Sequence, residues 1–244
     1  MKTEIGLLGF GRFGRMAYHH LCRGKQLRVY DTDSRKLADI PEAASFEGTV
    51  RSGLVLLCVP ISAIEDTCKK MAPLLREGQI VVDTCSVKQY PVSLMLAHLP
   101  PFVEILGTHP LFGPDSGQEG IAGLKIGVCR IRISDESYQM IRRYLESLHL
   151  VIIETDPEEH DRQIAKSQAI FHLLAQAMKR LGWDGQAIST PGPENFFRLV
   201  RMVQHDTEQL FLDMERENPY AAQYRQEFIR QLLELDRELT PAQE

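Results

Sequence analysis

The amino-acid sequence predicts an α/β fold in the first part of the chain and a small all-helical domain after it. Up to residue 155, short apolar runs rich in β-branched residues alternate with amphipathic segments of helical length. This alternation is typical of a mainly parallel sheet covered by helices. Beyond Asp156 and Pro157, no further strand-like run occurs. We therefore expect one domain over residues 1–155 and a helical domain over residues 156–244.

The elements of the first domain follow from its apolar pattern. Seven runs are predicted to be strands: Glu4–Leu8, Leu27–Asp31, Leu54–Val59, Gln79–Asp83, Val103–Gly107, Lys125–Ile131 and Leu150–Glu154. Most are apolar at successive positions, so we expect most of them to be buried on both faces of the sheet. Four segments are predicted to be helices: Arg12–Arg23, Ser62–Leu75, Pro91–His98 and Asp135–Leu148, the last with Ser134 as its N-cap.

The second domain is expected to consist of helices alone. Glycine, proline and asparagine interrupt its amphipathic pattern near residues 182–185, 190–193 and 218–219. These interruptions predict three or four helices.

The composition limits the function of the chain. Hydrophobic residues make up 43% and charged residues 25% of the 244 positions, and 28 Lys and Arg against 33 Asp and Glu leave a formal net charge of −5. Such a chain offers no general attraction to nucleic acid or to an acidic membrane. The longest uncharged apolar stretch, residues 53–64, is too short to span a bilayer, and no signal-peptide pattern opens the sequence. We expect a cytoplasmic protein with no nucleic-acid or membrane partner.

A glycine-rich loop follows the first predicted strand and opens the first predicted helix. The first glycine permits a tight turn, the second lets the backbone approach a pyrophosphate, and the third allows the helix to pack closely on the strand. This context predicts a Rossmann-type dinucleotide-binding site, against the alternative of an ordinary turn. The loop residues expected at the cofactor are Gly9, Gly11, Arg12, Phe13 and Gly14.

Asp31 ends the second predicted strand, where a carboxylate can accept both ribose hydroxyls of NAD and repel the 2′-phosphate of NADP. Arg35 and Lys36 lie close by in the sequence and weaken that preference. We expect NAD as the cofactor, with NADP as the alternative. Val59 ends the third predicted strand, Pro60 follows it, and both are expected to shape the cofactor crevice.

Polar side chains also follow the next two strands, at the edge where α/β sheets carry their working residues. His109 lies between the end of a strand and Pro110, in a loop rich in glycine and proline. An imidazole titrates near neutral pH, so His109 is a candidate general base, and Ser86 is a candidate to orient its ring. The alternative is structural: His109 caps a loop and Ser86 caps the next helix.

The helical domain opens with a polar stripe. Asp161, Gln168 and His172 share one predicted helix face with Ala165, where an amphipathic helix would normally bury apolar side chains, and His160 directly precedes them. The four polar residues are candidates to line a substrate cleft. The alternative is that Asp161 caps the helix and His172 is a buried, hydrogen-bonded histidine. No metal site is expected, because no further ligand follows at metal-like spacing and the five cysteines form no C-x-x-C pair.

Two arginines lie on an otherwise apolar helical segment near the end of the chain. Arg198 and Arg201 each offer a guanidinium fork suited to a carboxylate, or alternatively cover apolar neighbours with their stems. Further on, apolar residues recur at helical spacing and indicate core or a dimer seam. They are Tyr224, Phe228, Leu232, Leu235 and Leu239.

Four segments, taken together, resemble the prephenate/arogenate dehydrogenase family. They are GFGRFG (9–14), DTCSVK (83–88), GTHPLFGPDSG (107–117) and EHDRQIAKSQAIFH (159–172), in the family's order and spacing. The third is close to the family's HPMFGP signature, with Leu111 in place of Met. The resemblance implies that His109 is the base, that Ser86 supports it, and that an arginine, Arg198 or Arg201, binds a substrate carboxylate. It also implies a homodimer formed through the helical domain.

The reaction that this resemblance implies is an oxidative decarboxylation in tyrosine biosynthesis. A cyclohexadienol would pass a hydride to the nicotinamide and lose its ring carboxylate as CO2, leaving an aromatic ring. The sequence does not decide between prephenate and arogenate. Two other functions remain open: a dehydrogenase or reductase for another small hydroxy acid or imine, and a non-catalytic NAD-binding sensor.

Overall fold

The computed structural model describes residues 4–22, 24–203 and 205–240. The chain divides into two compact units, Met1–His160 and Asp161–Glu244. The sequence places this boundary between residues 155 and 156. In the structure it lies five residues later, because helix α6 (Pro157–Ile164) begins in the first unit and ends in the second.

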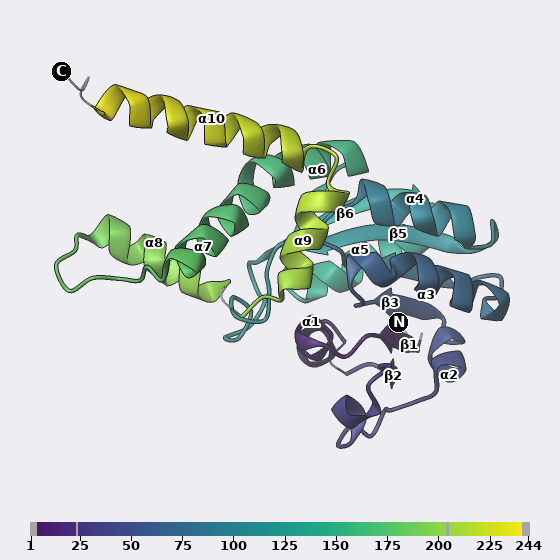
Figure 1. Ribbon diagram of the computed structural model, residues 1–244. Coiled ribbons are helices and arrows are strands. Elements are labelled where there is room, and N and C mark those ends of the chain that lie inside the picture. Colours follow the sequence, from purple (N-terminus) through teal and green to yellow (C-terminus); the bar gives the residue numbers. More distant parts are fainter. Residues whose placement is uncertain (1–3, 23, 204, 241–244) are drawn as a thin grey trace. The chain divides into compact units, whose positions relative to one another are not determined.

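A seven-stranded sheet forms the centre of the first unit (Figure 1). Its strands are β1 (Ile5–Leu8), β2 (Leu27–Tyr30), β3 (Leu54–Leu57), β4 (Ile80–Asp83), β5 (Glu104–Pro110), β6 (Lys125–Arg132) and β7 (Val151–Glu154), in the order β2-β1-β3-β4-β5-β6-β7. Each of the seven runs predicted from the sequence overlaps one of these strands. β6 extends one residue beyond its predicted run, and β5 extends three residues beyond, so His109 lies within β5 and not in the loop predicted after it. The fold is the predicted α/β arrangement.

One strand pair departs from the parallel pattern. β5 and β6 are antiparallel, whereas the other neighbouring strands pair in parallel. Parallel neighbours need a crossover connection, usually a helix, and the loop from Leu111 to Leu124 contains none. The expectation of burial on both faces is wrong for β7, which is an edge strand with Val151 47% and Ile153 39% exposed.

Helices cover both faces of the sheet. On one face lie α1 (Arg12–Met16), which continues as the π-helical turn Ala17–Leu21, and α5 (Asp135–Ser147). On the other face lie α3 (Ile64–Met71), flanked by 3₁₀ turns, and α4 (Gln89–His98). The predicted cap is confirmed, because the Ser134 hydroxyl accepts a hydrogen bond from the Ser137 N–H.

The helix predicted over Arg12–Arg23 has its expected end, Arg23, outside the described residues. Two short elements were not predicted: the 3₁₀ turn Ser34–Leu37 and α2 (Phe46–Val50). Neither is long enough to show a helical apolar period.

The described residues of the second unit form helices joined by loops, and no strand. After α6 come the π-helical turn Ala165–Ala169, α7 (Ile170–Leu181), α8 (Pro191–Met202), α9 (Glu208–Glu217) and α10 (Ala221–Leu239). Gly182 ends α7 in the left-handed conformation, with φ 67°, and Pro191 opens α8, at two of the predicted breaks. The sequence missed the break before Thr207, whose hydroxyl caps α9 by accepting from the Leu210 N–H. Because α6, the π-helical turn and α7 follow one another without a break, the described residues form four continuous helical segments, within the predicted three or four.

Candidate functional site

The glycine loop has the geometry that its sequence predicts. Gly9 follows β1 with φ +98°, and a Cβ atom there would lie 2.4 Å from the carbonyl oxygen of Cys58. A Cβ atom on Gly14 would lie 2.1 Å from the carbonyl oxygen of Gly9. A side chain at either position would therefore force the backbone apart. Gly11 is different, because nothing lies within 4 Å of the place where its Cβ would be, which leaves its backbone open to a ligand.

The other loop residues lie around this turn. Arg12 is exposed and donates to the carboxylate of Asp115, at 2.7 Å between Nη2 and Oδ2. Phe13 is half-buried and packs against the core on the α1 face. Val59 and Pro60 follow β3, with Val59 half-buried and Pro60 exposed.

Asp31 is tied to the glycine loop. Its carboxylate accepts hydrogen bonds from the backbone N–H of Phe10 (2.7 Å) and Asp33 (2.8 Å), and Lys36 Nζ lies 3.0 Å from Oδ1. Burial by itself raises the pKa of Asp31, but the N–H groups of Asp33 and Phe10, with Lys36, outweigh burial and lower it. Asp31 therefore carries its charge at the end of β2, next to the loop.

The segment after β4 is held by a buried ion pair. Asp83 and Lys88 are both fully buried, and Lys88 Nζ contacts Asp83 Oδ1. The same oxygen accepts from the Cys85 N–H at 2.9 Å, and the Asp83 carbonyl accepts from the Thr108 hydroxyl at 2.6 Å. This pair fixes the turn that carries Ser86. No role was predicted for Asp83 or Lys88 from the sequence. An acidic residue at the end of a strand, with a lysine a few positions later, could have indicated this ion pair.

His109 lies near the end of β5, opposite Gly127 of β6, and is only 4% exposed. Its Nδ1 lies 2.9 Å from Nε2 of His160, and the two ring centroids are 5.1 Å apart. Burial is the main cause that lowers the pKa of His109 well below its usual value, helped by His160 and by the charge of Lys88. The imidazole is therefore neutral at physiological pH.

Ser86 is half-buried in the turn that follows β4, the strand next to β5. Among the described residues it makes no hydrogen bond to His109. The structure instead brings His160, expected at the substrate, into contact with His109.

The remaining polar candidates lie in the second unit. Asp161 is buried, and its carbonyl accepts from Asn218 Nδ2 at 2.8 Å. Gln168 is half-buried, with Nε2 3.8 Å from the sulfur of Met214. Burial lowers the pKa of His172 to about 4, although a carboxylate oxygen of Asp206 lies 3.9 Å from its Nε2.

The two arginines of α8 differ in their surroundings. Both are exposed. Arg201 Nη1 lies 2.6 Å from Asp184 Oδ1, and the two groups form an ion pair. Within the described part of the chain, Arg198 has no ion-pair partner.

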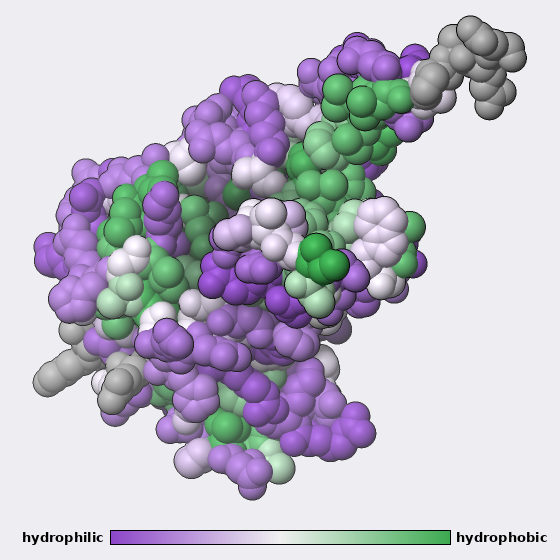
Figure 2. Space-filling model, turned by 90° about the vertical axis from the view of Figure 1, so that its left-hand side faces the viewer, coloured by the Kyte–Doolittle hydropathy of each residue, from purple (hydrophilic) through white to green (hydrophobic). Residues whose placement is uncertain are grey.

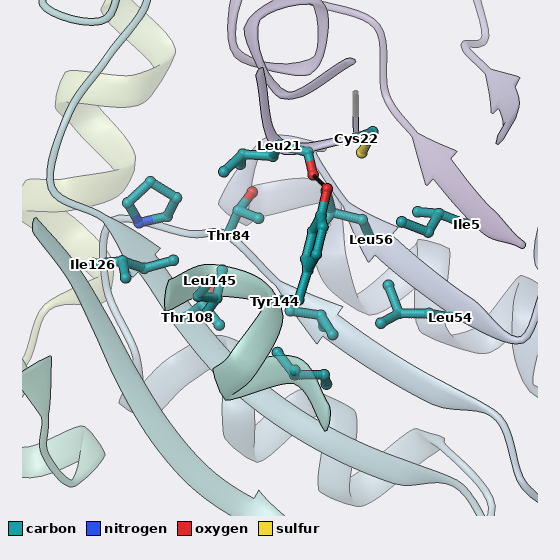
Figure 3. A pocket seen from close by; sticks show the side chains of 13 residues that line it. Ile5, Leu21, Cys22, Leu54, Leu56, Thr84, Thr108, Ile126, Tyr144 and Leu145 are labelled. Atoms are coloured by element: carbon teal, nitrogen blue, oxygen red, sulfur yellow. Dashed lines mark hydrogen bonds between the residues drawn. The ribbon is translucent and has the colours of Figure 1, made fainter. Parts of the chain in front are cut away.

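An apolar cavity of about 60 Å³ lies in the first unit, between α5 and the sheet (Figure 3). Tyr144 stands at one side, and its hydroxyl donates to the Leu21 carbonyl at 2.6 Å. No residue predicted to bind cofactor or substrate lines this cavity, but Thr108 and Pro110, the two chain neighbours of His109, do. None of the described helices is both long and apolar enough to cross a membrane.

The comparisons with known proteins agree with the resemblance seen in the sequence. Residues 23–123 match the family model for the nucleotide-binding domain of prephenate dehydrogenase. The chain is 30% identical over 235 residues to arogenate dehydrogenase 2, chloroplastic, of Arabidopsis thaliana, covering 89% of this chain and 64% of that protein. It is 25% identical over 250 residues to a 4-amino-4-deoxyprephenate dehydrogenase of Streptomyces pristinaespiralis, covering 93% and 81%.

Solved structures share the fold. A prephenate dehydrogenase from Aquifex aeolicus, in complex with hydroxyphenyl propionate and NAD+, superposes with a TM-score of 0.74 at 20% identity, covering 97% of this chain and 90% of that one. An arogenate dehydrogenase from Synechocystis gives 0.64 at 21% identity, covering 95% and 90%. The predicted Rossmann-type fold and the resemblance to this family are confirmed. The chain spans 64% and 38% of the length of the two Arabidopsis arogenate dehydrogenases that it matches.

Proposed function

We propose that this chain, which is related to the prephenate/arogenate dehydrogenases, catalyses the oxidative decarboxylation of a cyclohexadienol with hydride transfer to NAD. The substrate would be prephenate or arogenate, and the product would enter tyrosine biosynthesis. The observation that carries this proposal is His109, a buried and neutral imidazole at the carboxyl end of the sheet, in the segment that matches the family's signature.

The cofactor part of the proposal rests on the glycine loop and Asp31. The turn at Gly9, with φ +98°, and the open backbone at Gly11 suit a pyrophosphate, and the charged carboxylate of Asp31 suits a ribose diol. When bound, the oxidised nicotinamide accepts the hydride that leaves the alcohol carbon of the substrate. Because Lys36 partly neutralises Asp31, NADP stays the alternative cofactor.

His109 would move one proton back and forth. As the hydride leaves, the substrate O–H bond breaks and His109 takes the proton on Nε2, since Nδ1 is engaged with His160. The C–C bond to the ring carboxylate then breaks, its electron pair enters the ring, and CO2 departs. The ring oxygen becomes phenolic and recovers the proton from His109. Atoms and charge balance without a net release of protons to the solvent.

A cation is needed to hold a substrate carboxylate, and Arg198 is our choice. The chain as a whole is negative, so this charge must be local. Arg201 already pairs with Asp184, whereas the described residues leave the Arg198 fork without an ion-pair partner. Ser86, in the turn next to β5, is proposed to hydrogen-bond the substrate hydroxyl or the His109 ring. Gln168, His172 and Asp161 stay candidates for further substrate contacts.

A spectrophotometric assay tests the proposal. The purified chain is given prephenate and arogenate, each with NAD and with NADP, while reduced nicotinamide and CO2 are measured. We expect turnover of at least one cyclohexadienol and a loss of about 10²–10⁴-fold in kcat for His109→Asn, with unchanged binding of NADH. His98→Asn, a histidine outside the candidate site, is the matched control and should keep the full rate.

Other outcomes of this assay would point to the other functions. Full activity in His109→Asn contradicts the assignment of the base. Oxidation of a 3-hydroxy acid or reduction of an imine, with no reaction of either cyclohexadienol, supports a different dehydrogenase or reductase. Saturable NAD binding without turnover of any of these compounds supports a sensor.

We further propose a second copy of this chain as a partner. Helix α10 exposes an apolar stretch, part of the green surface at the upper right of Figure 2. Its members are Ile229, Leu232, Leu233, Leu235 and Leu239, between 43% and 82% exposed. An apolar stripe of this kind on a helix is typical of a dimer seam. Analytical ultracentrifugation should give twice the chain mass, and Leu232→Glu with Leu235→Glu should give the single chain mass.

A further inference from the structure

Two buried imidazole rings are in contact near the carboxyl end of β5. His109 lies near the end of β5 and His160 lies in α6, and they are 4% and 6% exposed. The hydrogen bond between Nδ1 of His109 and Nε2 of His160 is 2.9 Å long. The sequence predicts that His160 contacts the substrate, whereas this hydrogen bond indicates a role in orienting His109.

The neighbouring strand and helix leave space for the two imidazole rings. Asp156 follows β7, and its carboxylate caps α6 by accepting from the Glu159 N–H at 2.9 Å. One turn into the helix, the His160 ring fills the space that Gly127 leaves opposite His109. A Cβ atom on Gly127 would lie 3.5 Å from His160 Cδ2 and 3.9 Å from His109 Cβ. The two rings are therefore held by a strand, a helix cap and a glycine, and their contact is part of the fold.

We propose that His160 is a positioning residue, which holds His109 in the tautomer that carries its hydrogen on Nδ1 and so keeps Nε2 free to take a proton. This inference rests on the proposed function for the identity of the base. A hydrogen bond between two neutral imidazoles needs one N–H group and one bare nitrogen. If His109 donates, its Nε2 is bare. If His160 donates, His109 carries its hydrogen on Nε2 and is unable to act as the base.

Without a partner, an imidazole favours the tautomer with hydrogen on Nε2. A bare Nε2 on His109 therefore needs an acceptor at Nδ1, and His160 Nε2 is placed to be one. The charge of Lys88 also lowers the pKa of His109, and Lys88 is paired with the buried Asp83; neither residue is hydrogen-bonded to the His109 ring among the described contacts.

The pair also carries the proton during turnover. When the O–H bond of the substrate breaks and the N–H bond forms at His109 Nε2, the ring becomes a cation. Its Nδ1–H then donates to His160 as a charge-assisted hydrogen bond, which is stronger than the neutral one. If His160 were protonated as well, two cations would lie 2.9 Å apart in a buried site. The two rings together therefore take up only one additional proton.

Nuclear magnetic resonance of ¹⁵N-labelled histidine tests the inference without any substrate. Long-range ¹H–¹⁵N spectra distinguish a protonated ring nitrogen from a bare one, and the signals lost in His109→Asn identify His109. We expect a protonated Nδ1 and a bare Nε2 on His109 of the unmodified protein, and the reverse in His160→Phe. A bare Nδ1 in the unmodified protein, or an unchanged His109 pattern in His160→Phe, overturns the proposal.

Kinetics provide the second readout. We expect His160→Phe to lower kcat about 100-fold with little change in KM, because the ring is lost as an acceptor and not as a substrate ligand. His160→Gln, whose amide oxygen can accept from Nδ1, should recover activity to within about 10-fold. His98→Phe is the matched control. A rise in KM alone, or no recovery in His160→Gln, contradicts the positioning role.

The two proposals fail separately. If neither cyclohexadienol reacts, the proposed function is wrong, while the spectra still decide the tautomer of His109. If the substrates react but His109 carries its hydrogen on Nε2, the function stands and the role given to His160 is wrong.

Discussion

The carboxyl ends of β4 and β5 in the first unit and helix α8 in the second hold their polar side chains in opposite ways. In the first unit, the polar side chains at the sheet edge are buried and bind one another: His109 with His160, and Asp83 with Lys88. In the second unit, the basic side chains of α8 are exposed, and one of them, Arg201, pairs with an exposed carboxylate. A buried charge without a partner is costly, whereas an exposed one is solvated.

This difference decides what each unit tells us about function. Buried pairs have a defined geometry, so the proton chemistry of His109 can be derived from distances and burial. Exposed arginines have no such constraint, and their role depends on what they bind. The role proposed for His109 therefore depends on the buried geometry of the first unit. The choice of Arg198 to bind the substrate carboxylate depends on its having no ion-pair partner among the described residues.

The largest expected effect comes from breaking a buried pair of the first unit. Lys88→Met leaves the carboxylate of Asp83 buried without its cation. Removing one partner of a buried ion pair costs roughly 3–5 kcal/mol, and we expect this loss in the free energy of unfolding measured with urea.

A matched exposed pair gives the control for this variant. Lys69→Met breaks the surface pair with Glu65 and should cost less than about 1 kcal/mol. Replacing both buried partners, as in Asp83→Leu with Lys88→Met, should recover much of the stability. A loss below about 1 kcal/mol in Lys88→Met would remove the contrast between the two units.

The next effect concerns a buried histidine of the second unit. The pKa of His172 is lowered by burial to about 4 in the folded chain, from 6.5 when unfolded. Between these values the unfolded chain binds a proton that the folded chain does not. The free energy of unfolding should therefore fall as the pH drops from 7 towards 4, by roughly 3 kcal/mol from this residue.

The variant His172→Phe isolates this contribution, because His109 has the same direction of shift and is kept. The difference in stability between pH 7 and pH 5 should be smaller in His172→Phe than in the unmodified protein. If Asp206 instead held a protonated His172, acid would stabilise the unmodified chain relative to the variant, and the prediction would be wrong.

The sequence was most informative where local rules act. The strand runs, the Ser134 cap and the turn at Gly9 each depend on neighbouring residues, and they were predicted correctly. The antiparallel β6 was missed, because its direction depends on a loop without a helix, which apolar periodicity does not reveal. β7 was misjudged because an edge strand can have the same apolar run as a buried one.

The candidate site shows the same limit. His109 was found because it follows the predicted strand run, although β5 extends through it; its partner was expected to be Ser86 and is His160, 51 residues away in the chain. That contact depends on the space at Gly127 and on the cap at Asp156, which meet only when β6, β7 and α6 are in place. Non-local contacts of this kind leave no spacing signal in a single sequence.

A moderate effect is expected at the exposed arginines of α8. Arg198→Ala should raise KM for the cyclohexadienol about 10–100-fold with a smaller change in kcat, because a guanidinium–carboxylate contact contributes about 1.5–3 kcal/mol. Arg201→Ala should raise KM less than about threefold, since its guanidinium is already paired with Asp184. Steady-state kinetics of both variants decide the matter: equal effects, or the reverse order, would contradict the choice of Arg198.

The smallest effect is expected on the choice between NAD and NADP, from the partly exposed ion pair of Lys36 and Asp31 in the first unit. Lys36 Nζ lies 3.0 Å from Asp31 Oδ1 and partly neutralises the carboxylate that we propose binds the ribose. Lys36→Met removes that cation, so Asp31 should repel a 2′-phosphate more strongly. Because the pair is partly exposed, we expect only about a fivefold rise in KM for NADP, with KM for NAD nearly unchanged. Arg35→Met, which removes a cation paired with Asp33 instead, is the matched control and should change neither value. An equal rise for both cofactors in Lys36→Met would mean that Lys36 supports the loop and not the choice between NAD and NADP.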